Sequence, residues 1–245
     1  MPHMEPPGGA VDWPRGEGTL GVVGVAPWAT LDFLRAFYGR INAAKDWHYP
    51  RVIADVNTKL PSRGRHLELG EADPSPYIAS TLAELARQGA TVAVVPCNTA
   101  HLLHDRWAAG SPLPVPHIVR ETAAALAAAG ARRVVAFGSA SLRRQGLYER
   151  CLDEAGLLPQ ALGDGQAALV AQAIEDVKQR GTVGAALQAR LVDLLQALGR
   201  DRIDGVALGC TELASLVPLC QAAGLAVAES NDCLAAAALR LVQGT

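Results

Sequence analysis

Short apolar runs rich in valine alternate with longer amphipathic stretches along most of this chain, and "TLGVVGVA" at residues 19–26 is the first of these runs. The apolar runs predict β-strands at residues 19–26, 51–57, 90–96, 131–139, 203–209 and 224–230. The longer patterns predict helices at residues 30–44, 75–89, 117–130, 142–156, 165–181, 182–199 and 232–242. Strands that alternate with helices of this length are typical of parallel sheets covered on both faces by helices. The pattern therefore predicts an α/β fold.

A proline-rich stretch, "SPLPVPH" at residues 111–117, lies near the middle of the chain. Few helix or sheet hydrogen bonds can cross such a stretch, because proline has no backbone N–H. At 245 residues the chain can bury one large core or two modest ones. We therefore expect a boundary between two units here.

The first eighteen residues, "MPHMEPPGGAVDWPRGEG", are rich in proline and glycine and lack the apolar core of a signal peptide. They predict a flexible extension over residues 1–18 and a cytoplasmic protein. No apolar run reaches the length that a membrane span requires, so no membrane partner is expected. The formal net charge of −2 gives no electrostatic reason to expect nucleic acid as a partner.

Two cysteine-containing segments repeat one pattern, in which a predicted strand ends and a cysteine and a threonine follow. They are "VAVVPCNTAH" at residues 92–101 and "GVALGCTELA" at residues 205–214. Ligands of open α/β sheets bind beyond the carboxyl ends of the strands, where both Cys97 and Cys210 should lie. Unpaired N–H groups at the following helix starts favour thiolate over thiol, and Thr99 and Thr211 place hydroxyls nearby. The pattern therefore predicts a site that uses both sulfur atoms.

Other residues near these segments give weaker indications. Glu212 follows Cys210 by two positions, and if it approaches the sulfur its charge will raise the Cys210 pKa and make the two cysteines inequivalent. His101 and His104 could share a helix face, but no third ligand is suitably spaced, so we expect packing or hydrogen bonding and no metal. "GVVGVA" lacks the G-x-G-x-x-G spacing, and we expect no nucleotide cofactor.

"PCNTAH" and "GCTE" together resemble the paired cysteine motifs of the aspartate/glutamate racemase family, which works without pyridoxal phosphate. The likeness runs from about Leu20 to the C-terminus and includes "ATLDF", "PSR", "GLY", the lysine of "IEDVKQRG" and "ND". It implies two pseudo-symmetric α/β lobes, each a mainly parallel sheet flanked by helices, with the active site in the cleft between them. The first lobe would comprise residues 19–115 plus 227–245, and the second residues 116–226. Similar proteins also suggest a homodimer.

The resemblance implies cofactor-independent racemisation of an acidic amino acid, aspartate or glutamate. Racemisation removes the α-proton from one face of a carbon and returns a proton to the other, so two acid–base groups must face each other across the substrate. By family analogy, Cys97 and Cys210 form this pair, one as thiolate and the other as thiol in each direction. Backbone N–H groups near Asn98, Thr99 and Thr211 would stabilise the carbanion.

Further substrate contacts also follow from the resemblance. Arg63 in "PSR" and Lys178 in "VKQRG" match positions where similar racemases bind carboxylates. Ser139 or Ser141 in "GSASLRR" stands where a threonine-containing turn is common, and we take Ser141 as the candidate.

The stretch "GVAPWAT" after the first strand departs from the usual Gly-Gly-x-Gly turn and is one residue shorter. Two alternatives stay open, and this difference is the motive for the second of them. One is a related cysteine-dependent decarboxylase or isomerase of a small dicarboxylate. The other is a catalytically silent paralogue that binds a small molecule. The presence of both sulfur atoms favours the racemase.

Overall fold

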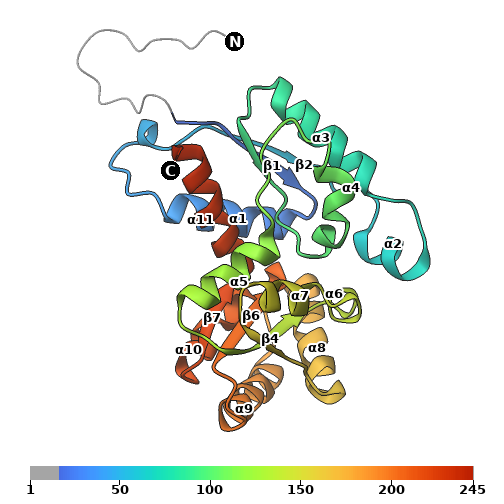
Figure 1. The fold of residues 1–245 in the computed structure, drawn as a ribbon, viewed down its shortest axis with the longest axis vertical. Helices are drawn as coiled ribbons and strands as arrows, with labels where there is room; N and C mark the ends of the chain where they lie inside the picture. The colour runs from blue at the N-terminus through green and yellow to red at the C-terminus, as the bar shows by residue number, and fades with distance from the viewer. Residues whose placement is uncertain (1–16, 245) are drawn as a thin grey trace.

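The computed structural model describes residues 17–244 (Figure 1). The expected flexible extension, residues 1–18, lies outside this part of the chain except for its last two residues. Within residues 17–244 the strands form two parallel sheets with helices packed against them, one in each half of the molecule. The predicted α/β class with two lobes is therefore confirmed.

The sheet of the first lobe has the order β2-β1-β3 and is parallel throughout. Leu20 of the central strand pairs with Val52 on one side and with Val92 on the other. The strands are β1 (Leu20–Gly24), β2 (Val52–Val56) and β3 (Val92–Val94). The helices are α1 (Pro27–Gly39), η1 (Asp46–His48), α2 (Arg63–Leu69), α3 (Ser75–Arg87), η2 (Thr99–Leu103) and α4 (His104–Ala108), where η marks a short 3-10 helix.

The sheet of the second lobe has the order β5-β4-β6-β7 and is also parallel. Its strands are β4 (Arg133–Gly138), β5 (Leu158–Gln160), β6 (Gly205–Gly209) and β7 (Ala226–Glu229). Its helices are α5 (Ile118–Ala128), α6 (Ala140–Gln145), α7 (Leu147–Glu154), α8 (Asp164–Arg180), α9 (Ala185–Arg200), η3 (Thr211–Leu216) and α10 (Val217–Ala222).

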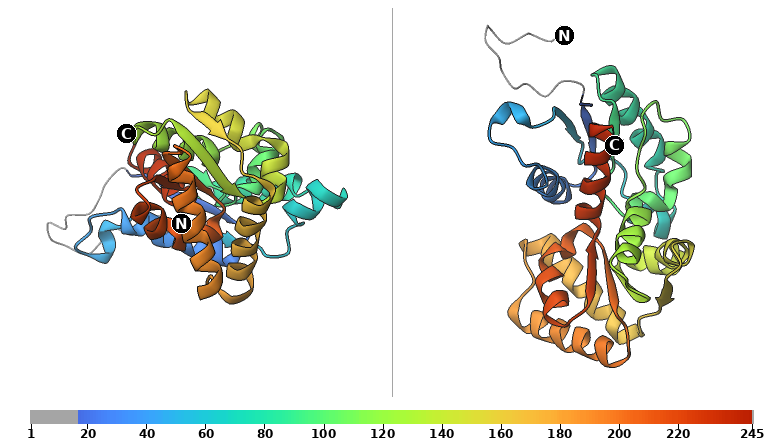
Figure 2. Two further views of the ribbon diagram at one scale, coloured as in Figure 1. Left: turned by 90° about the horizontal axis from the view of Figure 1, so that it is seen from below. Right: turned by 60° about the vertical axis from the view of Figure 1, so that its left-hand side comes forward.

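The last helix, α11 (Ser230–Gln243), leaves the second sheet and packs against α1, α5 and β3. Figure 2, in its right-hand view, shows this red helix running from one lobe up to the other. Its apolar side chains, such as Leu234 and Val242, share a buried core with Leu20 and Phe37 of the first lobe. The chain therefore passes between the lobes twice, although the exact lobe limits expected from the sequence stay a prediction.

Two local expectations were wrong. Residues 142–156 do not form one helix, because Gly146 takes a left-handed conformation with φ of 63° and ends α6 before α7 begins. Strand β5 was not expected, since it is only three residues long and contains Pro159. Among residues 17–244 it pairs only with β4, and an edge strand tolerates a proline that a central strand would exclude.

Parallel strands bring their carboxyl ends to the same edge of each sheet, and these edges face each other across the cleft. Strands β1, β3 and β6 are completely buried apolar runs, which fixes their position in the core. The residues that follow β1, β3, β4 and β6 line a single cavity. The fold thus brings loops from both lobes to one place.

Candidate active site

A cavity of about 310 Å³ lies between the carboxyl ends of the two sheets. Both lobes contribute to its wall, and α2 reaches it from the first lobe. The eight residues that the sequence indicated for the site all line this cavity: Arg63, Cys97, Asn98, Thr99, Ser141, Lys178, Cys210 and Thr211. A cavity of this size is in the range of small-molecule sites.

The two cysteines reach the cavity from equivalent positions. Cys97 follows β3, with its N–H donating to the carbonyl of Val95 at 2.7 Å, and Cys210 directly follows β6. Both are free thiols and both are partly exposed. Helix starts were expected after both cysteines, and the elements that follow are the short 3-10 helices η2 and η3. Short 3-10 turns have weak dipoles, so their contribution to thiolate stability is small.

The thiol of Cys210 donates a hydrogen bond to Oε2 of Glu212 at 2.8 Å. The hydroxyl of Thr211 donates to the same oxygen at 3.1 Å. Burial, and then the charge and hydrogen bond of Glu212, raise the pKa of Cys210 well above its usual value, and Lys178 opposes this only in part. The expectation that the helix start favours a thiolate was therefore wrong for Cys210. The conditional expectation for Glu212 was correct, since this carboxylate does approach the sulfur.

The side chain of Asn98 is already engaged. Its Oδ1 accepts a hydrogen bond from the Tyr148 hydroxyl at 2.8 Å, and its Nδ2 donates to Ser230 Oγ at 2.8 Å. All three side chains are buried. Asn98 can therefore offer a substrate its backbone N–H rather than its amide.

Thr99 lies at the junction between the lobes. Its hydroxyl is 3.4 Å from the hydroxyl of Ser139, which follows β4 and caps α6. Both side chains line the cavity. A hydroxyl from each lobe is thus available to the same bound group.

Arg63 and Lys178 are cations that line the cavity from opposite lobes. Arg63 is the first residue of α2, where the Ser62 hydroxyl caps the helix by accepting from the N–H of Arg65. The Nε of Arg63 is buried and has no hydrogen-bond partner among the described residues. Lys178 comes from the last turn of α8 in the second lobe. A buried donor without a partner is costly, so Arg63 is suited to receive an anion.

Glu68 is a lining residue that sequence reasoning missed. Its Oε1 accepts hydrogen bonds from Ser141 Oγ at 2.7 Å and from Arg144 Nη2 at 2.9 Å, both on α6. These hydrogen bonds, with the Arg144 charge, hold the pKa of Glu68 below its usual value. The Ser141 hydroxyl is therefore committed to a contact that joins α2 to the second lobe. The capping serine and the glycine that ends α2 would have predicted this helix, but no local signal reveals the contact across the cleft.

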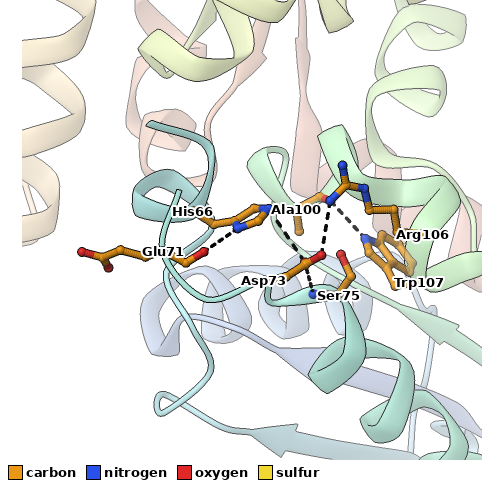
Figure 3. Close-up of polar contacts among 7 residues, drawn as sticks. All are labelled: His66, Glu71, Asp73, Ser75, Ala100, Arg106 and Trp107. Atoms are coloured by element: carbon orange, nitrogen blue, oxygen red, sulfur yellow. Dashed lines mark hydrogen bonds and ion pairs between the residues drawn. The ribbon is translucent and has the colours of Figure 1, made fainter. Parts of the chain in front are cut away.

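The far end of α2 is fixed by the polar contacts in Figure 3. His66 Nδ1 lies 2.7 Å from the carbonyl oxygen of Glu71, and its Nε2 is 3.9 Å from Asp73. The other Asp73 oxygen accepts from Arg106 at 3.2 Å on α4. The neighbouring Trp107 donates its indole N–H to the carbonyl of Ala100 at 3.0 Å. The contacts of His66 and Asp73 attach the helix that carries Arg63 to α4 of the first lobe.

Two absences concern only the described part of the chain. Within residues 17–244, no group of three or more His, Cys, Asp or Glu side chains is arranged to hold a metal ion. None of the helices in this range is long and apolar enough to cross a membrane.

Comparison with known proteins gives a consistent result. The family model for Asp/Glu/hydantoin racemases matches residues 21–238. An aspartate racemase from Picrophilus torridus has a similar structure, with a TM-score of 0.79 and 21% identity over 92% of this chain and 94% of that one. A putative Asp/Glu racemase from Yersinia pestis gives a TM-score of 0.80 and 23% identity over 92% and 99%. The glutamate racemase of Thermus thermophilus gives 0.63 and 20% over 93% and 81%. At these identities the solved structures support the fold.

Proposed function

The chain belongs to the Asp/Glu/hydantoin racemase family, and we propose that it racemises an acidic amino acid, aspartate or glutamate, by a two-base mechanism that uses Cys97 and Cys210. The observation that carries the proposal is that both thiols line one cavity together with Arg63 and Lys178. The thiols supply the acid and the base, and the cations supply partners for the substrate's carboxylates.

In one direction, the Cys97 thiolate removes the α-proton and Cys210 delivers its thiol proton to the opposite face of the carbon. Cys97 is then the thiol and Cys210 the thiolate, which is the state that the reverse reaction needs. Glu212 stabilises the thiol form of Cys210, in which this direction begins. Its carboxylate accepts a hydrogen bond from the thiol, and its negative charge would repel the negative charge of a thiolate. Cys210 is therefore the sulfur that we assign as the thiol at the start of this direction.

The carbanion between these steps needs donors that are already in place. Candidates are the backbone N–H groups at Asn98 and Thr99 and the hydroxyls of Thr99 and Ser139, which come from different lobes. The Thr211 hydroxyl donates to Glu212, so Thr211 offers its backbone instead. These backbone N–H groups and hydroxyls are therefore the donors that we assign to the reacting carbon and its α-carboxylate.

The second carboxylate of an acidic substrate requires a cation. Arg63 is the stronger candidate, because its buried Nε lacks a partner and a guanidinium can bind a carboxylate with two hydrogen bonds. Lys178 approaches from the other lobe and would act as a point charge. A substrate held by both cations would also draw the lobes together.

The test is to incubate the protein with the L- and D-forms of aspartate and glutamate in heavy water. Loss of the α-proton signal by NMR, together with inversion seen by chiral chromatography, supports racemisation. Silence with every acidic amino acid would overturn the proposed function.

Cysteine variants test the mechanism. Cys97→Ser and Cys210→Ser should abolish racemisation, while one of them retains α-proton exchange of a single enantiomer. Cys220→Ala removes a buried thiol of α10 outside the cavity and serves as the matched control. Full racemisation by either serine variant contradicts the two-base assignment.

A further inference from the structure

Tyr148 connects the loop of one catalytic cysteine candidate to the strand of the other. It lies in the first turn of α7 in the second lobe and is 2% exposed. Its hydroxyl donates at 2.8 Å to Oδ1 of Asn98, the residue directly after Cys97. The Asn98 amide in turn donates to Ser230 at the start of α11. One chain of buried hydrogen bonds thus joins three segments that are distant in sequence.

The ring of Tyr148 packs on the other cysteine segment. A Cβ atom added to Gly209 would lie 2.6 Å from Tyr148 Cζ and 2.8 Å from its hydroxyl oxygen, closer than side chains approach each other. Only glycine leaves room for the ring at this position, and Gly209 directly precedes Cys210. Tyr148 therefore contacts the residue next to each cysteine in the sequence: its hydroxyl contacts the residue after Cys97, and its ring contacts the residue before Cys210.

We propose that Tyr148 is a positioning residue that fixes the separation of the Cys97 and Cys210 sulfur atoms across the cleft. The inference rests on the proposed two-base function, because only that mechanism needs a set distance between them. Tyr148 is not among the residues that line the cavity, and in this proposal it acts through Asn98 and Gly209.

The energetics of the network make this link stiff. Both polar atoms of the Asn98 side chain have a partner, and none of the three side chains faces solvent. Burial raises the pKa of Tyr148 well above its usual value, so its hydroxyl remains a donor throughout an ordinary assay range. Removing that donor leaves Asn98 Oδ1 buried without a hydrogen bond, and the loop must move to recover one.

The first experiment compares Tyr148→Phe with wild type and with Tyr77→Phe, which makes the same chemical change on a residue that is 51% exposed. Tyr148→Phe keeps the ring against Gly209 and removes the hydroxyl, and with it the hydrogen bond to Asn98 and the polar contact with Thr122. We expect kcat to fall about 10- to 100-fold, because small displacements of reacting groups have effects of this size. The KM should change less than about threefold, since the carboxylate-binding residues are untouched.

The same variant should also change the fate of the α-proton. When the two sulfurs are misaligned, the carbanion is reprotonated more often on the face it came from, so deuterium enters recovered substrate at the expense of inverted product. A merely structural role would lower activity without changing the ratio of deuterated recovered substrate to inverted product. Wild-type kcat and an unchanged ratio in Tyr148→Phe overturn the inference.

A second readout does not depend on activity. A bifunctional thiol reagent such as dibromobimane bridges two sulfurs only when they lie close together, and peptide mapping identifies the bridged pair. We expect Cys97–Cys210 bridging in wild type and in Tyr77→Phe, and at least about a fivefold slower reaction in Tyr148→Phe at equal labelling of the single thiols. Equal bridging rates in wild type, Tyr77→Phe and Tyr148→Phe overturn the inference. If wild type has no racemase activity but the bridging rate is still lower in Tyr148→Phe, only the proposed function is overturned.

Should Tyr148→Phe fail to fold, Ser230→Ala removes the other partner of Asn98 and leaves Tyr148 in place. It should shift the deuterium ratio and the bridging rate in the same direction, by a smaller amount. Wild-type values for both measurements in a folded Ser230→Ala protein count against the network.

Discussion

Glu229, the last residue of β7, is a buried carboxylate whose titration should control stability. It is 8% exposed, and its two oxygens accept hydrogen bonds from the N–H groups of Asn231 and Asp232 at 2.9 and 2.8 Å, which caps α11. Burial raises its pKa from 4.5 to about 7, although the two N–H groups oppose the change. Replacing Glu229 by glutamine removes this titration.

The direction of the pH dependence follows from which state of the protein, folded or unfolded, binds the proton of Glu229 more tightly. Because the folded pKa is the higher one, the protonated form is favoured by folding, and the contribution to stability is complete below the unfolded pKa of 4.5. It is lost as the pH rises through about 7. The difference of about 2.5 pKa units corresponds to about 3 kcal/mol of unfolding free energy. Glu229→Gln cannot ionise and should lack this loss.

The assay is urea unfolding of wild type and Glu229→Gln followed by circular dichroism between pH 4 and 8.5. The difference in unfolding free energy, wild type minus variant, should fall by about 3 kcal/mol across this range. Glutamine keeps one acceptor oxygen, so loss of one capping bond adds a constant offset of about 1 kcal/mol at every pH.

Glu175→Gln, an exposed position on α8, is the matched control and should run parallel to wild type. A difference between wild type and Glu229→Gln that stays constant within about 0.5 kcal/mol, or that rises with pH, refutes the reasoning.

Three further predictions test the site and the core. Glu212→Gln removes the charge that raises the Cys210 pKa, so alkylation of that thiol by iodoacetamide, followed by peptide mapping, should begin at lower pH; an unchanged profile contradicts the contact. Arg63→Gln should raise the KM for an acidic amino acid about 10- to 100-fold with a smaller effect on kcat, and an unchanged KM would remove Arg63 from the carboxylate site. Phe37→Ala in the core shared by α1 and α11 should lower the unfolding free energy by about 3–5 kcal/mol in urea titrations, while a loss below about 1 kcal/mol would show that the core collapses around the gap.

The central strands and the site they form could be predicted from the sequence. The apolar runs around β1, β3 and β6 are the buried strands, because a strand covered on both faces needs apolar residues at nearly every position. Since parallel strands end at one edge, the residues after β3 and β6 could be expected to meet. Cys97 and Cys210 do line one cavity for this reason.

The contacts that join the lobes could not be predicted in this way. Glu68 meets Ser141 across 73 positions, and Tyr148 meets Asn98 across 50. The local sequence pattern around each of these four residues does not differ from that around an ordinary exposed or packed side chain. Such pairs depend on how two lobes dock, which periodicity does not encode. The pKa of Cys210 was mispredicted for a different reason, because burial and the approach of Glu212, two positions away, depend on the folded conformation of this segment.

The return of α11 to the first lobe has a consequence for biosynthesis. One core of the second lobe draws only on residues between 135 and 227, whereas the core around β1 and α1 also needs side chains from residues 233–242. On a ribosome, the early strands of the first lobe must therefore remain without their final helix while the whole second lobe emerges. At the usual rate of about 5–20 residues per second, this interval lasts about 6–25 seconds. The core formed by β6, α8 and α9 can consequently form first, whereas the core shared by both lobes must wait for α11.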